Sequence, residues 1–356
     1  MAGLSVGNII SRGNNNLDLI RLLAAISVIV YHSFPLNPQW GLTDPIKDAF
    51  GYMTTGGLAV KVFFFISGLL VTNSLLSRKS TIHFVISRAL RIFPGLAFVL
   101  ILTALVIGPI FTTMPLIDYF KSGQPLVYIL KNLSLQTQYF LPGLFEGNKY
   151  GANGSLWTIH YEVFAYVVLL GIYLLGIGKS QWLSSLACLC IIIEPISPLK
   201  GVLFSSSDNN AIYLLAPCFA LGSLLAINKD LYKSNIIIPV VIFVSQFIFT
   251  SEAISSLLLC ASICLVLLHI SSLETVKKIR VRQDISYGVY LWGFPIQQVI
   301  SQSFHFGFFA NVLLSILLTM AIALVSWVVI EKPAINFAKL IATKGVHPSS
   351  VRSTHK

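Results

Sequence analysis

Long, unbroken runs of apolar residues constrain this chain more than any other feature. Residues 19–36, LIRLLAAISVIVYHSFPL, form one such run, and similar runs recur along the chain. They do not alternate with polar residues as the strands of a membrane barrel would. Since a helix needs roughly 20 apolar residues to cross a bilayer and satisfies its own backbone there, the runs predict membrane-spanning helices.

Composition supports an all-α polytopic membrane protein. Of the 356 residues, 55% are hydrophobic and 10% charged, whereas soluble domains have about 25% charged residues. The first run lacks a small-residue cleavage site after it, so we expect it to be retained as a span. We predict about ten transmembrane helices, at 17–36, 57–76, 92–111, 156–176, 182–197, 211–227, 235–250, 253–270, 285–302 and 309–330.

Basic residues predict the orientation of these spans. With the N-terminus in the cytoplasm, 18 of the 24 Lys and Arg residues lie inside and six lie outside. Cytoplasmic connections carry such an excess, so we expect both termini to be cytoplasmic. The net charge of +11 then belongs to the flanks of membrane helices, in contact with the lipid bilayer, and needs no nucleic-acid partner.

We expect one membrane domain, residues 1–343, and a polar C-terminal tail, 344–356. The longest predicted connection, 112–155, is external, and loops of this length are often functional. The five cysteines all fall inside apolar runs and are expected to pack in the core. Neither an H-E-x-x-H motif nor a Cys/His cluster occurs, so we predict no metal site.

Two ionisable residues lie on one face of the first predicted span. Arg21 and His32 are eleven positions apart, which is about 20° beyond three full turns and roughly 16 Å along the helix. An ionisable group within a span is a functional candidate, and His32 is the deeper of the two from the cytoplasmic side. The alternative is an interfacial histidine that reaches outward to water.

The fourth predicted span begins with a polar stripe. Ser155, Thr158, Glu162 and Tyr166 recur at helical spacing, so we expect Glu162 to point into the bundle. His160 lies about 200° away and is expected to point elsewhere. Glu162 and His32 share the outer half of the predicted topology, where a carboxylate could orient an imidazole. A structural ion pair or an interfacial carboxylate is the alternative for Glu162.

Two further segments carry polar residues. Arg88 and Arg91, at i and i+3, share a helix face and could clamp a phosphate, or they could be ordinary cytoplasmic flanking charge. In the ninth predicted span, Tyr290 and Gln297 lie roughly on one face with Ser286 and Gly293. Gln297 and Gln298 within a span suggest a polar cavity or hydrogen bonds between helices, and helix packing is the safer interpretation for these two.

Together these segments resemble the integral-membrane acyltransferase 3 family over about residues 17–337. The matching segments, in chain order, are R-x10-H at Arg21 and His32, GGLAVKVFFFISGLLV with Ser67 and Gly68, R-x-x-R at Arg88 and Arg91, SLWTIHYEVFAY with Trp157, Glu162, Phe164 and Tyr166, SYGVYLWGFPI, and SWVVIEKP ending at Glu331 and Pro333. Two departures are Gly293, where many members have a histidine, and the His160–Tyr161 pair before the acid.

The resemblance implies transfer of an acyl group, usually acetyl, from cytoplasmic acetyl-CoA to a sugar hydroxyl of a cell-envelope polysaccharide or its lipid-linked precursor. We expect a multi-pass protein of the bacterial inner (plasma) membrane. We expect His32 to be the general base and Glu162 to orient it or bind the acceptor. We expect acetyl-CoA to be bound by Arg88, Arg91, Arg21 and Ser67.

The expected acceptor-binding residues are Trp157, Ser155, Tyr166, Tyr290 and Gln297. Direct transfer and a covalent acyl-enzyme both stay open, with Ser67 as the one candidate nucleophile. The competing interpretation is an exporter of a lipid-linked or acylated glycan, since intramembrane charges also suit transport. No internal repeat supports that alternative.

Overall fold

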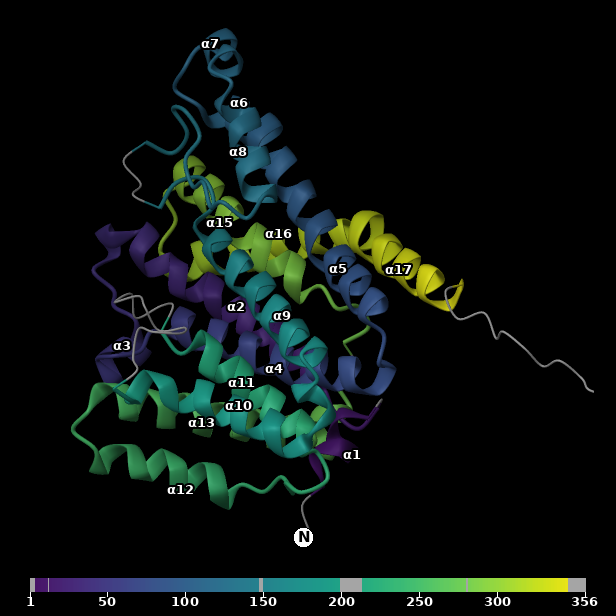
Figure 1. Ribbon diagram of the computed structural model, residues 1–356. Coiled ribbons are helices and arrows are strands. Elements are labelled where there is room, and N and C mark those ends of the chain that lie inside the picture. Colours follow the sequence, from purple (N-terminus) through teal and green to yellow (C-terminus); the bar gives the residue numbers. More distant parts are fainter. Residues whose placement is uncertain (1–3, 12, 147–149, 199–212, 280, 345–356) are drawn as a thin grey trace, which may run out of the picture.

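The computed structural model describes residues 4–11, 13–146, 150–198, 213–279 and 281–344, and within them every named element is helical (Figure 1). The elements in chain order are α1 (Val6–Ile10), α2 (Leu17–Leu36), η1 (Pro38–Trp40), α3 (Pro45–Phe50), α4 (Thr55–Arg78), α5 (Thr81–Leu102), η2 (Thr103–Ile107), α6 (Gly108–Phe111), α7 (Leu116–Lys121), α8 (Gln124–Leu133), η3 (Gly154–Thr158), α9 (Ile159–Leu174), η4 (Ile177–Lys179), α10 (Gln181–Ile193), η5 (Glu194–Ile196), α11 (Leu215–Ile227), α12 (Ile237–Ser245), η6 (Gln246–Ile248), α13 (Glu252–Ser271), α14 (Glu274–Lys277), α15 (Ser286–Ser303), α16 (Phe308–Ser326), η7 (Trp327–Glu331) and α17 (Lys332–Lys344).

Each of the ten predicted apolar segments contains a helix. Six helices in the described part of the chain are long and apolar enough to cross a membrane. They are Leu17–Leu36, Thr55–Arg78, Thr81–Phe111, Gly154–Leu174, Glu252–Ser271 and Phe308–Ile341. Three shorter apolar helices cover 181–196, 215–227 and 237–248. The structure therefore confirms an all-α architecture built on apolar helices, while the number of crossings and their direction stay predictions.

Some predictions fall on residues that the structure does not describe. The C-terminal tail lies outside the described residues from 345 onward, as does the start of the sixth predicted span. Six basic residues of the charge count also lie outside: Arg12, Lys149, Lys200, Arg280, Arg352 and Lys356.

The third predicted span begins eleven residues earlier than expected. Ser80 caps α5, its side chain accepting a hydrogen bond from the backbone N–H of His83, and Lys79 makes the preceding turn with φ 52°. Such a cap fixes a helix start independently of hydropathy. Arg88 and Arg91 consequently lie inside α5 and not in a connection.

A very close helix contact joins α4 to α11. A Cβ at Gly68 would lie 2.0 Å from the carbonyl oxygen of Phe219, and a Cβ at Gly222 would lie 2.1 Å from that of Phe65. The two glycines thus let the helix backbones touch, as small residues do in membrane helix pairs. Phe65 and Leu69 are buried on the same face of α4, so this contact places one wall of the bundle interior.

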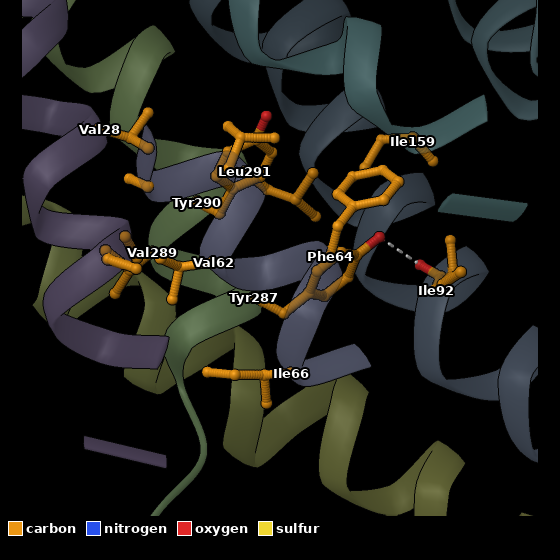
Figure 2. Packing of buried hydrophobic residues seen from close by; sticks show 14 of the residues in the cluster. Val28, Val62, Phe64, Ile66, Ile92, Ile159, Tyr287, Val289, Tyr290 and Leu291 are labelled. Atoms are coloured by element: carbon orange, nitrogen blue, oxygen red, sulfur yellow. Dashed lines mark hydrogen bonds between the residues drawn. The ribbon is translucent and has the colours of Figure 1, made fainter. Parts of the chain in front are cut away.

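Helix α15 lies in the middle of the bundle and is buried along most of its length. It packs on α2 and α16, and the hydroxyl of Tyr287 donates to the carbonyl of Ile92 on α5 at 2.9 Å. Figure 2 shows this bond, with Phe64 of α4 and Tyr290 of α15 close by in the same interior. α15 therefore brings residues from α2, α4, α5 and α9 around one centre.

The long connection 112–153 is not a plain loop. It contains α7 and α8, which with α6 form a projection at the top of Figure 1. Tyr119 of α7 ties this projection to η2, since its hydroxyl donates to the carbonyl of Ala104 at 2.8 Å. The returning residues then lead into η3 and α9.

Candidate active site

His32 lies on the wall of a cavity of about 340 Å³ between α2, α4, α9 and α15. The described residues that line it include no Lys, Arg, Asp or Glu. Its walls are rich in aromatic rings, which come from Tyr31, Tyr139, Tyr150, Trp157, Tyr161, Tyr290 and Phe294. We call this space the His32 cavity.

Two glycines make room for rings in this wall. A Cβ at Gly56 would lie 2.3 Å from Cδ1 of Tyr31, and a Cβ at Gly154 would lie 2.7 Å from Cε2 of Phe294. The ring of Phe294 in turn meets His32 edge-on, with centroids 4.9 Å apart. The GG sequence of α4 and the glycine before the SLW segment therefore shape the surroundings of the histidine.

The imidazole of His32 is not held by a carboxylate. Its Nδ1 is buried and has no hydrogen-bond partner among the described residues. Glu162 instead accepts a hydrogen bond from the hydroxyl of Tyr166, four residues along α9. The predicted orientation of His32 by Glu162 is thus absent from this geometry, because the shared depth of two residues does not make their helices present them to each other.

Glu162 lines a second, smaller cavity of about 40 Å³. Arg21, Ser67 and Tyr290 line the same cavity, so four predicted site residues come together here. We call this space the Glu162 cavity. Val60 and Tyr290 line both cavities and form the partition between them.

Hydrogen bonds fix Tyr290 in this partition. Its hydroxyl lies 2.8 Å from the hydroxyl of Thr158 and donates to the carbonyl of Ser155 at 3.0 Å. Ser155 itself lines neither cavity, and its side chain is buried without a partner among the described residues. The predicted polar stripe is therefore divided. Ser155 and Thr158 lie in a 3₁₀ helix, whose turn differs from that of the α-helix that carries Glu162 and Tyr166.

A partly buried ion cluster that the sequence interpretation missed lies beside the Glu162 cavity. Asp284, just before α15, binds Arg21 at 2.8 Å and Arg91 at 2.6 Å. Burial alone would raise the pKa of Asp284, but the two guanidinium groups outweigh it and hold that pKa well below its ordinary value. One carboxylate thus ties α2 and α5 to the start of α15. Its signal in the sequence was an acidic residue after the basic run 277–282.

The predicted phosphate clamp of Arg88 and Arg91 is not assembled. Arg91 pairs with Asp284 and lies over the rings of Tyr287 and Trp327, at 5.8 and 5.5 Å from their centroids. Arg88 lies over the ring of Tyr166 at 6.0 Å. The two guanidinium groups share a helix face as predicted, but neighbouring helices engage them differently.

Gln297 lies outside both cavities. Its side-chain amide donates to the carbonyl of Ile29 and to the hydroxyl of Ser33, both at 2.8 Å. The residue is fully buried and holds α15 to α2, so the packing interpretation describes it and the predicted acceptor contact does not. Nearby, a Cβ at Gly293 would lie 2.9 Å from Cγ1 of Ile29, which leaves little room for the histidine of other members.

His160 corrects another prediction. It was expected to point away from the bundle interior, yet it lines the His32 cavity. Its Nδ1 lies 3.3 Å from the hydroxyl of Thr137, which belongs to the long connection. The connection therefore contacts the start of α9 on the side opposite Glu162, where His160 lies. Hydropathy could not reveal this contact.

The arrangement suits proton transfer next to a polar ligand. A histidine without a charged partner faces a cavity whose aromatic walls can receive the apolar faces of a ring-shaped molecule. On the other side of Tyr290, Arg21, Ser67 and Glu162 offer charged and hydroxyl groups. In the described part of the chain, no three His, Cys, Asp or Glu side chains converge as metal ligands would.

Comparison with known proteins agrees with this picture. Residues 14–331 match a family model described as an acyltransferase domain. An O-acetyl transferase of Shigella phage Sf6 is 29% identical over 90% of this chain and 95% of its own length. Nodulation protein 10 of Rhizobium leguminosarum bv. viciae is 28% identical over 90% of this chain and 93% of its own length. O-acetyltransferase OatA of Staphylococcus aureus is 25% identical over 89% of this chain and 56% of its own length. No solved structure matches the chain.

Proposed function

Since the chain belongs to the acyltransferase 3 family and is an integral-membrane O-acetyltransferase, we propose that it moves an acetyl group from cytoplasmic acetyl-CoA to a sugar hydroxyl of a cell-envelope glycan. The observation that carries this proposal is His32 on the wall of an aromatic cavity, one partition away from the charged Glu162 cavity. Because the matching family model is an acyltransferase domain, we favour a transferase over an exporter.

The sugar is proposed to occupy the His32 cavity. Aromatic side chains such as Trp157 and Tyr150 would stack on the apolar faces of sugar rings, while His160 would contact a hydroxyl group. The described lining carries no charged side chain, which favours a neutral sugar over an acidic one. Tyr290, at the partition, would be the wall nearest the incoming acetyl group.

The donor is proposed to enter from the side of Arg88 and Arg91. Arg88 has no carboxylate partner among the described residues, so it is the more available of the two for a phosphate of acetyl-CoA. The thioester arm would reach the Glu162 cavity, where Arg21, Ser67 and Glu162 would contact it. Tyr290 and Val60 would then shift to join the two cavities.

His32 is proposed as the general base. It would take the proton of the sugar hydroxyl as the oxygen attacks the thioester carbonyl. The C–S bond then breaks, and the imidazolium returns the proton to the leaving sulfur, which gives the acetyl ester and CoA thiol. Ser67 lies in the other cavity, on the far side of Tyr290 from His32, which favours direct transfer over a seryl acyl-enzyme.

Replacing His32 with alanine tests the proposal. We expect acetylation of the envelope glycan to fall by about 10²- to 10⁴-fold, the typical contribution of a general base. Mass and NMR spectra of the glycan from cells that carry the wild-type protein or His32→Ala measure the effect. His305→Ala is the matched control, since His305 is exposed between α15 and α16 and lines neither cavity. Full acetylation in the inserted His32→Ala protein would exclude the catalytic role.

A further inference from the structure

A third cavity, of about 300 Å³, lies between α4, α9, α10 and α11. We call it the α9–α11 groove. None of its described lining residues is charged. The hydroxyl of Thr72 donates to that of Ser223 at 2.8 Å, and the hydroxyl of Ser184 donates to the carbonyl of Ile177 at 2.9 Å. The serine and threonine hydroxyls on the wall are thus used within the protein, and the groove offers a ligand mainly hydrocarbon.

The groove is long and open to the membrane. Its wall on α9 extends from Tyr161 to Tyr173, which is about 18 Å at 1.5 Å per residue. Phe164, on the same wall, is 52% exposed on the surface of an apolar helix that is long enough to cross the bilayer. A space of this length and polarity fits an extended hydrocarbon chain that enters from the lipid.

One end of the groove adjoins the His32 cavity. Tyr161 lines both spaces, and its ring packs between Trp157 and His160, which also line the His32 cavity. The groove then follows α9 away from this end, toward Gly178. An apolar chain in the groove would therefore have its end at Tyr161, next to the histidine.

We propose that the α9–α11 groove binds the lipid tail of the acceptor, so that the substrate is a lipid-linked sugar with its sugar in the His32 cavity. This inference rests on the proposed function, because it assigns the polar end of the same molecule to the His32 cavity. The arm of acetyl-CoA, with its amide groups, would leave polar atoms unpaired in this groove. A bulk phospholipid tail would fit the apolar wall, and the experiment separates the two.

The test is binding of a polyprenyl phosphate to the protein in phospholipid nanodiscs, measured by native mass spectrometry. Ala187 lines the groove from α10, so Ala187→Trp fills it. We expect at least tenfold weaker retention of the polyprenyl phosphate by this variant. Val167→Trp is the control, because Val167 is 61% exposed on α9 and lies outside the groove lining.

The outcomes are distinct. Equal retention by wild type and Ala187→Trp would overturn the assignment, and so would wild-type protein that leaves the nanodisc with phospholipid bound and no polyprenyl phosphate. If Ala187→Trp does not fold, Ala187→Leu gives a smaller obstruction and a graded loss is expected. Binding needs no acetyl transfer, so a wild-type protein that binds the probe but acetylates no sugar would contradict the proposed function and not the groove.

Discussion

At the scale of single residues, the site is divided in two by Tyr290. His32 faces an aromatic cavity without charged lining, and Arg21, Ser67 and Glu162 face the smaller one. The separation keeps His32 apart from the acid that was expected to orient it. The carboxylate that does organise charged side chains is the partly buried Asp284, which holds Arg21 and Arg91.

Asp284→Asn is expected to destabilise the protein by about 3 kcal/mol, because two mostly buried guanidinium groups lose their nearest counter-charge. Thermal unfolding in detergent, followed by size-exclusion chromatography, measures the change. Glu274→Gln is the control, since Glu274 pairs with Lys277 but is 81% exposed, and we expect little effect there. Equal stability of Asp284→Asn and wild type would contradict the role of the ion cluster.

The same cluster predicts a pH dependence. Folding lowers the pKa of Asp284. The stabilisation that its carboxylate provides is therefore complete above the pKa of the unfolded chain, about 3.9, and is lost as the pH falls from there toward the pKa of the folded protein. We therefore expect the free energy of unfolding of the wild type to fall more than that of Asp284→Asn as the pH is lowered from about 5. The same thermal unfolding measurement checks this.

At the scale of elements, the sequence pattern predicted where helices form far better than it predicted which elements pack against each helix. All ten apolar segments contain helices, because hydropathy and length follow from local sequence. The start of α5 at residue 81, the inward position of His160 and the separation of His32 from Glu162 were not predicted. A helical wheel orders residues around one axis, whereas these features depend on which helix or connection packs against each side.

Gly68 tests the helix contact that supports the site. A Cβ there would meet the carbonyl oxygen of Phe219 at 2.0 Å, so Gly68→Ala must push α4 and α11 apart. We expect a loss of about 1–3 kcal/mol, typical of overpacking, together with reduced acetyl transfer because Ser67 and Phe64 move with α4. Melting temperature and activity are measured on the same preparation.

Gly171→Ala provides the matched control for this substitution. A Cβ at Gly171, also within a membrane helix, would meet no heavy atom within 4 Å. Alanine is the better helix former, so stability should be unchanged or slightly higher. If both glycine variants behave alike, the close approach of α4 and α11 does not limit stability.

At the scale of the whole molecule, the proposed function needs the helices to connect a cytoplasmic donor site with an external acceptor site. The predicted topology, with both termini in the cytoplasm, places Arg88 and Arg91 on the donor side and the connection 112–155 on the acceptor side. In the proposed mechanism, Tyr290 would mark the point where an acetyl group passes from one cavity to the other. The reaction would be vectorial, with donor and acceptor supplied from opposite faces of the membrane.

Sealed proteoliposomes test this account most directly. Purified protein is reconstituted with de-O-acetylated envelope glycan, or its lipid-linked precursor, inside the vesicles and labelled acetyl-CoA outside. The account predicts labelled acetyl ester on the enclosed glycan and an equal amount of free CoA outside, with both products strongly reduced in His32→Ala. Ester that forms only when acetyl-CoA and glycan share one compartment, or undiminished ester from His32→Ala, would contradict it.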